Sequence, residues 1–452
     1  MERIFDLDAV LAEVRRALEA GRIDEAVRVL SDQRPADLVE VFEELEDEEQ
    51  IDLLPRLEVE DSADVLEYLD DPEAAELADE LNDADLVRII DEMEPDEAAD
   101  LLGDLDPERR RSILAQLEDP DEIRPLLLYD DDTAGGRMTS DVLALRRRMT
   151  VADALEAVRT TAPSPSAETL YYLYVVDRDG RLVGVTCLYD LLRAESGALL
   201  AEIMSPDVIS VEADVDQEQV ARLMTRYSLL SAPVVSRDGV LLGLITHDDL
   251  VDVMEREATE DLQRQGASQP LDRNYLDTPA VTVARKRAGW LLLLFFTGTL
   301  TSQVLQLYET ELATVVALTF FIPLLIGTGG NAGAQTTSTI IRSLALREID
   351  LHDGLHVLWH ELRVGLSLGL IIGALGLGLA LLWGTPWNVA QAVALALLAI
   401  VVWANVVGSL LPLLATRLHI DPALVSNPLM STVVDATGLL IYLQIAKAIL
   451  RI

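Results

Sequence analysis

The longest apolar segments of the chain lie within its last 170 or so residues, and they constrain the fold more than any other feature. They cover about 288–308, 312–341, 364–384, 389–416 and 422–449. Each is long enough to cross a bilayer as a helix, which takes about 20 apolar residues. A core helix of a water-soluble protein would be neither this long nor this apolar. The sequence therefore predicts an α-helical polytopic membrane domain with five spans over 286–452.

The third apolar segment carries glycines at a helical spacing. Gly365, Gly369 and Gly373 recur every four residues, and Gly376 follows three residues later. Small residues at this spacing form one smooth face of a helix, along which a neighbouring membrane helix can approach closely. We therefore expect the third span to pack tightly against another span.

The charge of the chain is concentrated outside this membrane region. The whole chain has a formal net charge of −43, yet its first 280 residues contain 70 acidic and 26 basic residues, a net charge of −44. Because this region is so acidic, it should repel the phosphate backbone of nucleic acids. We therefore expect no nucleic-acid partner. Cations are the expected partners. Adaptation to salt or a biased composition is the alternative cause, because only two lysines occur in the chain.

Basic residues beside the spans indicate the orientation in the bilayer. They stand before the first span, after the second and after the fourth. By the positive-inside rule, this places the N-terminal domains in the cytoplasm of a multi-pass protein of the cell inner membrane. Lys447 and Arg451 would then face outward, which conflicts with the rule. The single cysteine, Cys187, cannot form an internal disulfide and gives no support for an oxidising compartment.

One carboxylate lies inside the last apolar segment. Asp435 follows Asn427 and Pro428 by about two helical turns, and no Lys or Arg lies at a comparable depth. A charge there costs about 2.5–3.5 kcal/mol on insertion scales, and intramembrane acids commonly mark ion pathways. The alternative is a protonated Asp435 that makes a hydrogen bond between helices. Oxygen ligands alone suit Mg²⁺ or Ca²⁺ better than soft metals.

The second apolar segment contains a glycine-rich motif, Gly327-Thr-Gly-Gly-Asn-Ala-Gly333. Its spacing imitates a dinucleotide-binding fingerprint, but no strand precedes it and no βαβ unit surrounds it. A closely packed or broken membrane helix fits the context better. Asn331, Gln335 and Thr336 could either line a polar cavity or bond to neighbouring helices.

An internal repeat occupies residues 138–262. Met138-Thr-Ser-Asp-Val matches Met204-Ser-Pro-Asp-Val, and both copies continue with a helical pattern, at 151–160 and 216–227. A β-rich hairpin with Asp-Gly at its turn and a second helix follow in each copy. The repeat resembles a tandem pair of cystathionine-β-synthase (CBS) domains.

That resemblance implies a nucleotide site. In CBS domains a Thr or Ser, followed by an Asp three residues later, binds nucleotide ribose. The second copy has Thr246 and Asp249, whereas the first has Cys187 and Asp190. ATP at the CBS pair therefore remains an open expectation, with Asp190 and Thr246 as its candidate residues.

The first 130 residues have an all-helical pattern. Amphipathic segments of about 12 residues recur there, with apolar residues on one face and acids on the other. Pro72, Pro95 and Pro107 each follow an acidic residue and suit the first position of a helix. We expect a small superhelical stack. The expected helices are 36–45, 61–69, 72–81, 84–92, 95–104 and 107–117.

Taken in order, these parts resemble one family, the MgtE-type magnesium transporters or channels. Its most specific motifs here are Gly327-Thr-Gly-Gly-Asn331, Asp421-Pro-Ala-Leu-Val-Ser-Asn-Pro-Leu429 and Asp435-Ala-Thr-Gly-Leu-Leu-Ile-Tyr442. The resemblance implies a multidomain homodimer in the lipid bilayer that takes up Mg²⁺ and is not an enzyme. The expected divisions are an acidic helical superhelix domain (1–130), two CBS domains (131–200 and 201–262), a connecting plug helix (263–285) and a transmembrane pore domain (286–452).

The same resemblance implies two sets of metal sites. In the pore, Asp435 from both subunits would hold hydrated Mg²⁺, with Asn427 and Asn331 nearby. Regulatory Mg²⁺ would bridge acidic faces of the cytosolic domains and close the pore. Spacing alone is weak support, because chance pairs are easy to find among 70 acids. The candidate regulatory residues are Asp96, Asp100, Glu218, Asp249, Asp252, Glu257, Glu260 and Asp421.

Two details remain open at this level. Asp421 precedes Pro422 and could cap a helix, contact a cation, or do both. Ser228 stands where the family can have an acid, so a regulatory site that uses this position would be weaker or absent. The rival functions are a CBS-regulated transporter of another divalent cation such as Co²⁺ or Mn²⁺, or of an anion, and a membrane-anchored nucleotide sensor or enzyme. Asp435 disfavours an anion path, and no catalytic constellation supports an enzyme.

Overall fold

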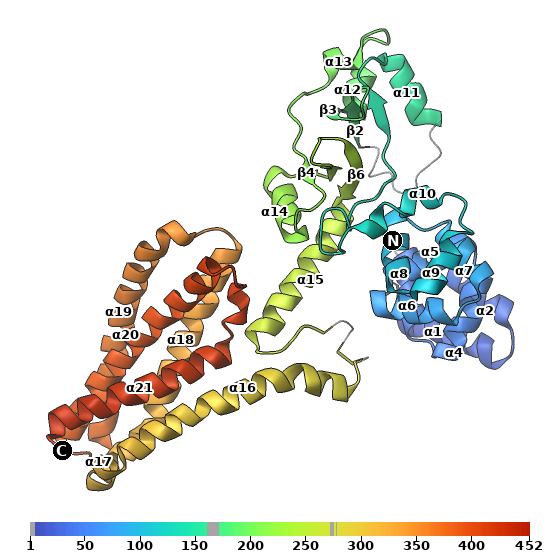
Figure 1. Ribbon diagram of the computed structural model, residues 1–452. Helices are drawn as coiled ribbons and strands as arrows, with labels where there is room; N and C mark the ends of the chain where they lie inside the picture. The colour runs from blue at the N-terminus through green and yellow to red at the C-terminus, as the bar shows by residue number, and fades with distance from the viewer. Residues whose placement is uncertain (1–4, 161–170, 272–274, 277) are drawn as a thin grey trace. The chain divides into compact units, whose positions relative to one another are not determined.

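A computed structural model of the chain describes residues 5–160, 171–271, 275–276 and 278–452. The chain divides into two compact units, Met1–Arg256 and Glu257–Ile452. The first contains the acidic helices and the CBS-like repeat, and the second contains the membrane helices (Figure 1). Each unit is described by itself below.

The N-terminal part of the first unit is a stack of short helices. Pro72, Pro95 and Pro107 lie in the first turns of their helices, where the missing proline N–H costs nothing. The expected helices are confirmed, with boundaries that shift by a few residues. Their bounds are α1 Leu7–Glu19, α2 Ile23–Ser31, α3 Pro35–Glu43, α4 Asp47–Leu53, α5 Val59–Tyr68, α6 Asp71–Glu80, α7 Asp83–Ile90, α8 Pro95–Asp104, α9 Pro107–Leu114 and α10 Pro120–Ile123.

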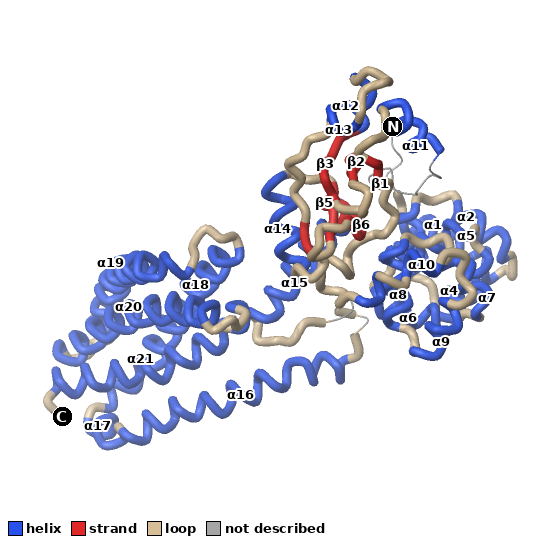
Figure 2. Tube along the Cα trace, turned by 45° about the horizontal axis from the view of Figure 1, so that its top comes forward, coloured by secondary structure: helices blue, strands red, loops and turns tan. Residues whose placement is uncertain are grey.

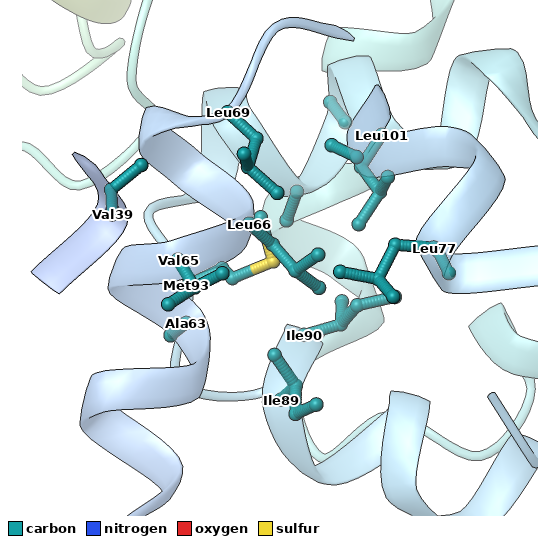
Figure 3. Close-up of a cluster of buried hydrophobic side chains, with 14 of the residues drawn as sticks. Val39, Ala63, Val65, Leu66, Leu69, Leu77, Ile89, Ile90, Met93 and Leu101 are labelled. Carbon is teal, nitrogen blue, oxygen red and sulfur yellow. The ribbon is translucent and has the colours of Figure 1, made fainter. Parts of the chain in front are cut away.

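The apolar faces of these short helices share one core. Leu66 of α5, Leu77 of α6 and Ile90 of α7 gather at its centre (Figure 3). Helices of 4–13 residues are marginal alone, so their stability comes from this packing rather than from helix propensity. The charged faces turn outward, as the amphipathic pattern predicts.

The CBS-like repeat forms two small sheets of the same topology (Figure 2). In each sheet the first strand pairs in parallel with the second, which pairs antiparallel with the third. The hairpins turn at Gly180 and Gly239, whose φ angles of 79° and 80° favour glycine. The elements are β1 Ala144–Arg146, α11 Val151–Thr160, β2 Tyr172–Val176, β3 Leu182–Cys187, α12 Leu188–Arg193 and α13 Leu200–Ile203, then β4 Val211–Glu212, α14 Gln217–Tyr227, β5 Ser231–Val235, β6 Leu241–Thr246 and α15 His247–Gln265.

The second unit contains all the helices in the described residues that are long and apolar enough to span a membrane, five in number. Four of them, α18 to α21, lie side by side in a bundle (Figures 1 and 2). The first, α16, contacts α21 and has no buried residue. The expected five-span domain is confirmed. The five spanning helices are α16 Ala280–Leu307, α18 Ile322–Ala345, α19 Gly354–Leu382, α20 Trp387–Arg417 and α21 Asn427–Leu450. The short helix α17 Glu309–Thr314 lies between the first two.

The glycine face of α19 packs against α20, as its spacing predicts. Gly365, Gly369, Gly373 and Gly376 are all buried. A Cβ atom added to Gly369 would lie 2.9 Å from the Leu398 carbonyl oxygen and 3.2 Å from the Leu398 Cα. Because these neighbours are backbone atoms, they cannot rotate away from an added methyl group.

Gly369→Ala should therefore destabilise the membrane domain. We expect a loss of about 1–3 kcal/mol in the free energy of unfolding, the usual cost of overpacking. Thermal unfolding in detergent would measure the change. Gly378→Ala on the same helix is the matched control, because an added Cβ there meets nothing within 4 Å. Equal melting temperatures for the two variants would contradict the close packing.

The connecting helix expected over 263–285 is not continuous in the described residues. α15 ends at Gln265, α16 begins at Ala280, and residues 272–274 and 277 lie outside the described part. The helix ends where Ala267 takes a left-handed conformation, with φ of 59°, and Pro279 caps the next helix. A proline disfavours the helical conformation of the residue before it, so a helix seldom runs through it. The apolar pattern alone therefore overestimates the length of this helix.

The outward-facing lysine of the last span has an acidic partner. Lys447 Nζ lies 2.7 Å from Glu311 Oε1 and 6.0 Å from the centre of the Tyr308 ring. Glu311 belongs to α17, in the loop between the first two spans. This pairing offsets the positive charge that conflicts with the positive-inside rule, so the predicted orientation needs no change.

Candidate ion path and regulatory acidic sites

Asp435 lies where α21 passes the glycine-rich part of α18. A Cβ atom added to Gly330 would lie 3.5 Å from Asp435 Oδ1 and 3.3 Å from Ser431 Oγ. A Cβ atom added to Gly329 would lie 2.9 Å from Val434 Cγ1. The glycines therefore let α21 approach α18 closely enough to place the carboxylate beside its backbone.

The Asp435 carboxylate is half-buried and makes no hydrogen bond or ion pair with any other described residue. The alternative role, a hydrogen bond between helices, is thus not found in the part of the chain that the structure describes. An unpaired carboxylate at this depth in a span is costly and is usually retained for a function.

Asn427 is also held against α18. Ser338 Oγ lies 3.1 Å from Asn427 Oδ1, at the beginning of α21. Thr432 and Thr437 are further oxygen-bearing residues of α21, and their hydroxyls donate to carbonyls of their own helix, Pro428 and Val433. Their hydroxyl oxygens retain lone pairs, but neither hydroxyl is aimed at Asp435 by these bonds.

The polar residues in and after the glycine-rich motif were expected either to line a polar cavity or to bond to neighbouring helices, and the structure shows both arrangements. Asn331 and Gln335 are exposed on the surface of α18. Thr336 is buried and its hydroxyl bonds to Glu361 of α19 at 3.4 Å. The first two are thus available to line a polar path, and the third joins two helices.

Acids of the first unit meet where α8 packs near α15. Asp96 and Asp100 of α8 and Asp249 and Asp252 of α15 line one cavity of about 20 Å³. Its other lining residues are Glu97, Gly136, Arg137, Val253 and Arg256. The two pairs predicted from spacing, at i, i+4 and i, i+3, therefore face the same cavity. Five carboxylates and two guanidinium groups line it.

Asp96 is the most buried of these acids. It is 5 % exposed, and its Oδ1 atom has no hydrogen-bond partner in the described part of the chain. Burial, and then the neighbouring Asp249, raises the pKa of Asp96 well above its ordinary value. Burial likewise raises the pKa of Asp249, although the hydrogen bond from Thr246 opposes the effect. Ionisation of both acids in this cavity is thus costly, because burial and their proximity both favour the neutral forms.

Two arginines partly compensate these acids. Arg137 Nη1 donates to Asp100 Oδ2 at 2.9 Å, and Arg256 reaches both carboxylate oxygens of Asp71 on α6 at 3.1 and 3.2 Å. Burial nevertheless raises the pKa of Asp100 to about 7. Burial and the charge of Glu67 raise the pKa of Glu94, at the start of α8, to about 7.

The other regulatory candidates are paired elsewhere. Glu218 forms an ion pair with Arg222 one turn along α14, apart from the cavity. Glu260 and Asp421 both contact Arg264, which places one guanidinium between the end of α15 and the loop before α21. Glu257 lies three residues before Glu260 on α15. Ser228 ends α14 in a left-handed conformation, with φ of 53°.

The helix-capping alternative for Asp421 is supported, although for a different helix. Asp421 Oδ1 accepts a 2.8 Å hydrogen bond from the Ala423 N–H and caps a short 3₁₀ turn, Pro422–Leu424. The last span is capped instead by Ser426, whose Oγ accepts from the Leu429 N–H. Asp421 therefore caps a turn and contacts a cationic side chain at once.

The candidate nucleotide residues form the same local pair in both CBS copies. Thr246 Oγ1 donates to Asp249 Oδ2 at 2.6 Å, and Cys187 Sγ lies 3.2 Å from Asp190 Oδ2. The cysteine preserves the contact but is a weaker donor than a hydroxyl.

None of these clusters is a closed metal site. Within the described residues, no group of three or more His, Cys, Asp or Glu is arranged to hold a metal ion. A cation in the ion path would therefore be held through its water shell, which suits Mg²⁺, an ion that dehydrates reluctantly. The acidic cavity, of about 20 Å³, would accept a cation only after its side chains move apart.

Glu361 is a polar residue that the sequence analysis missed. It lies on α19 and accepts hydrogen bonds from Thr336 of α18 and Asn405 of α20. The available signal was an acid three residues before an apolar segment, at 364–384. The apolar pattern starts only at 364, whereas α19 begins at Gly354, ten residues earlier. This pattern therefore did not indicate that Glu361 lies inside the helix.

Comparisons with known proteins agree with this organisation. The family described as "Divalent cation transporter" matches residues 322–445, the MgtE intracellular N domain matches 33–132, and the CBS domain matches 134–197 and 200–256. The magnesium transporter MgtE of Thermus thermophilus is 47 % identical over 330 residues, 73 % of each chain. The chain belongs to the MgtE family of magnesium transporters.

Other MgtE proteins support the same assignment. MgtE of Enterococcus faecalis is 36 % identical over 335 residues, which is 74 % of this chain and 73 % of the relative. A crystal structure of the cytosolic domain of an MgtE Mg²⁺ channel in complex with ATP is 38 % identical, with a TM-score of 0.51, and covers 54 % of this chain and 99 % of that one. This MgtE-family chain is therefore a membrane transporter with a cytosolic N-terminal region, and its family is one of transporters rather than enzymes.

Proposed function

We propose that the chain mediates selective uptake of Mg²⁺ and that cytosolic Mg²⁺ closes its pore. The observation that carries the transport proposal is Asp435, a carboxylate that lies beside Gly330 in the membrane domain and has no partner among the described residues. Mg²⁺ keeps several of its waters and is typically held by one or two carboxylates. A path with facing carboxylates would recognise the size of the hydrated ion instead of stripping its shell.

The pore would be completed by a second copy of the chain. α16 has no buried residue, and an odd number of spans gives no internal two-fold symmetry. A symmetric homodimer would bring two copies of Asp435 to one axis. Asn427, and the exposed Asn331 on the facing helix α18, would supply amide oxygens for hydrogen bonds to the ion's waters.

Regulation would rest on the acidic cavity between α8 and α15. Its five carboxylates exceed its two guanidinium groups, so their mutual repulsion favours separation of the two helices. Bound Mg²⁺ would turn the repulsion between the carboxylates into attraction through the cation. It would thereby stabilise the state in which α8 and α15 are in contact. The proposed ligands there are Asp96, Asp100, Asp249 and Asp252. Glu218, Glu257, Glu260 and Asp421 would act at further bridges.

Arg264 gives a local example of the chemistry proposed for these bridges. Its guanidinium already contacts both Glu260 and Asp421. A divalent cation could take the same position if the arginine side chain moved away. The two acids are thus close enough for one cation to join them.

ATP is proposed as a further ligand of the CBS pair. A related MgtE cytosolic domain was crystallised with ATP. Here Thr246 and Asp249 form the expected pair in the second copy, whereas Cys187 replaces the hydroxyl in the first. We expect one nucleotide site, which uses Thr246 and Asp190 from the two copies.

Flux into proteoliposomes tests the proposed function. We expect ²⁸Mg²⁺ uptake by the full chain that stops when Mg²⁺ is also raised on the cytosolic side. Co²⁺ and Mn²⁺ should compete only at higher concentrations. Stronger uptake of Co²⁺ or Mn²⁺ would assign another divalent cation. Uptake that ignores cytosolic Mg²⁺ would overturn the gating proposal while leaving transport intact.

A further inference from the structure

Glu361 joins three membrane helices through one carboxylate. Its Oε2 atom accepts a hydrogen bond from Thr336 Oγ1 of α18 at 3.4 Å and another from Asn405 Nδ2 of α20 at 3.3 Å. Glu361 itself lies on α19 and is partly buried. No other described side chain bridges these three helices by hydrogen bonds.

The partners of Glu361 are deeply buried. Asn405 is 1 % exposed and Thr336 is 7 % exposed. The other amide atom of Asn405, Oδ1, has no partner in the described residues. A buried amide that is half-satisfied relies on its remaining bond, and a bond to a charged group is stronger than one to a neutral group. Glu361 therefore holds Asn405 in an otherwise unfavourable setting.

Close helix packing surrounds this contact and leaves little room for sliding. A Cβ added to Gly365, one turn after Glu361, would lie 3.1 Å from Val402 Cα of α20. One added to Gly408 would lie 2.8 Å from the Gly333 carbonyl oxygen of α18. Thr337 Oγ1 also donates to the Gly408 carbonyl at 3.2 Å. The bond between Thr336 and Glu361 thus adds to this close packing, and together they limit the rotation of α18.

The opposite side of α18 carries the contacts of the proposed ion path. Gly330 lies beside Asp435, and Ser338 bonds to Asn427. At 3.6 residues per turn, Thr336 is about 120° around the helix from Gly330 and about 160° from Ser338. A rotation of α18 that broke the Glu361 bond would therefore move the path-facing residues as well.

We propose that Glu361 is a positioning residue for the ion path, which acts by setting the rotation of α18 relative to α21. The proposal rests on the proposed transport function. It explains why an acid is retained at a buried helix junction, where a neutral residue would pack at lower cost. It also predicts that Glu361 affects ion recognition without touching the ion.

A swap of the two partners tests the proposal. Glu361→Ala should raise the half-saturating Mg²⁺ concentration for uptake about tenfold and reduce the preference for Mg²⁺ over Co²⁺, while the protein remains folded and dimeric. Asn405→Asp should do the same, because it places two carboxylates together. The double variant Glu361→Gln with Asn405→Asp reverses donor and acceptor, and should restore both quantities to near the wild-type values. Glu348→Gln, an exposed acid in the loop before α19, is the matched control and should change neither.

The outcomes separate this inference from the transport proposal. Absence of Mg²⁺ uptake by the wild-type chain would reject the transport function itself. Normal wild-type uptake with unchanged ion preference in Glu361→Ala would overturn the positioning role, even if the melting temperature fell. Failure of the double variant to recover ion preference would overturn the proposed pairing. A melting-temperature cycle over the wild type, Glu361→Gln, Asn405→Asp and their double variant measures the Glu361–Asn405 coupling independently of transport, and absence of coupling would also overturn the inference.

Discussion

Asp435→Asn should reduce Mg²⁺ uptake in proteoliposomes at least about a hundredfold. The substitution keeps the size of the side chain and removes its charge, so it isolates the electrostatic contribution. Each hydrogen bond to a charged group contributes roughly 1.5–3 kcal/mol, and two subunits would each lose their carboxylate. Asp435 makes no bond to another described residue, so the variant should fold as well as the wild type or better.

Glu309→Gln is the matched control for this experiment. Glu309 is an exposed acid of the same domain, in the loop between the first two spans. Its neutralisation should leave uptake within about twofold of the wild type, as expected for a surface charge in salt. Undiminished uptake by Asp435→Asn would make Asp435 a packing residue and shift attention to Asn331 and α18.

The parts of the fold that follow from periodicity were predictable from the sequence. The spans, the short amphipathic helices and the CBS-like repeat each have a regular apolar pattern that few other structures satisfy. Asp435 was found for a related reason, since a carboxylate within an apolar segment is conspicuous. The glycines of α19 were likewise identified as a packing face, and they contact the backbone of α20.

The features that escaped prediction depend on local breaks and on partners distant in the sequence. Glu361 lies among polar residues before an apolar segment, and only the packing of α18 and α20 reveals that it is partly buried. The plug helix was placed over 263–285, although the left-handed Ala267 and Pro279 interrupt it. Sequence spacing paired Asp96 with Asp100, but it could not show that Arg137 would neutralise one and leave the other unpaired.

The acidic cavity makes the contact between α8 and α15 sensitive to pH. Burial is the main cause that raises the pKa values of Glu94 and Asp100 to about 7, and burial also raises the pKa of Asp96 well above its ordinary value. A carboxyl with a raised pKa binds its proton more tightly in the folded state, so its folded state loses stability as pH rises from the ordinary value, near 4, to the raised value. Without Mg²⁺, the contact should therefore weaken as pH rises from about 4 to about 7, the range that the pKa values of Glu94 and Asp100 set.

Hydrogen exchange on the full-length protein in detergent would measure this effect in peptides from α8 and α15. We expect exchange to accelerate between pH 5 and pH 7, after correction for intrinsic rates, and millimolar Mg²⁺ to suppress the acceleration. Asp96→Asn should slow exchange at pH 8 without Mg²⁺, because the amide cannot ionise and removes one charge from the buried acidic cluster. It should also weaken the response to Mg²⁺, since a ligand is lost.

Asp104→Asn provides the matched control, because Asp104 lies on the same helix but is exposed. Its exchange should keep the Mg²⁺ response of the wild type. If Asp96→Asn instead accelerated exchange at pH 8, the buried carboxylate would be stabilising, through a water or cation that holds its unpaired oxygen. If it left both the pH response and the Mg²⁺ response unchanged, repulsion in this cavity could not drive the proposed gate. Regulation would then have to depend on the other bridges, beginning with Glu260 and Asp421 at Arg264.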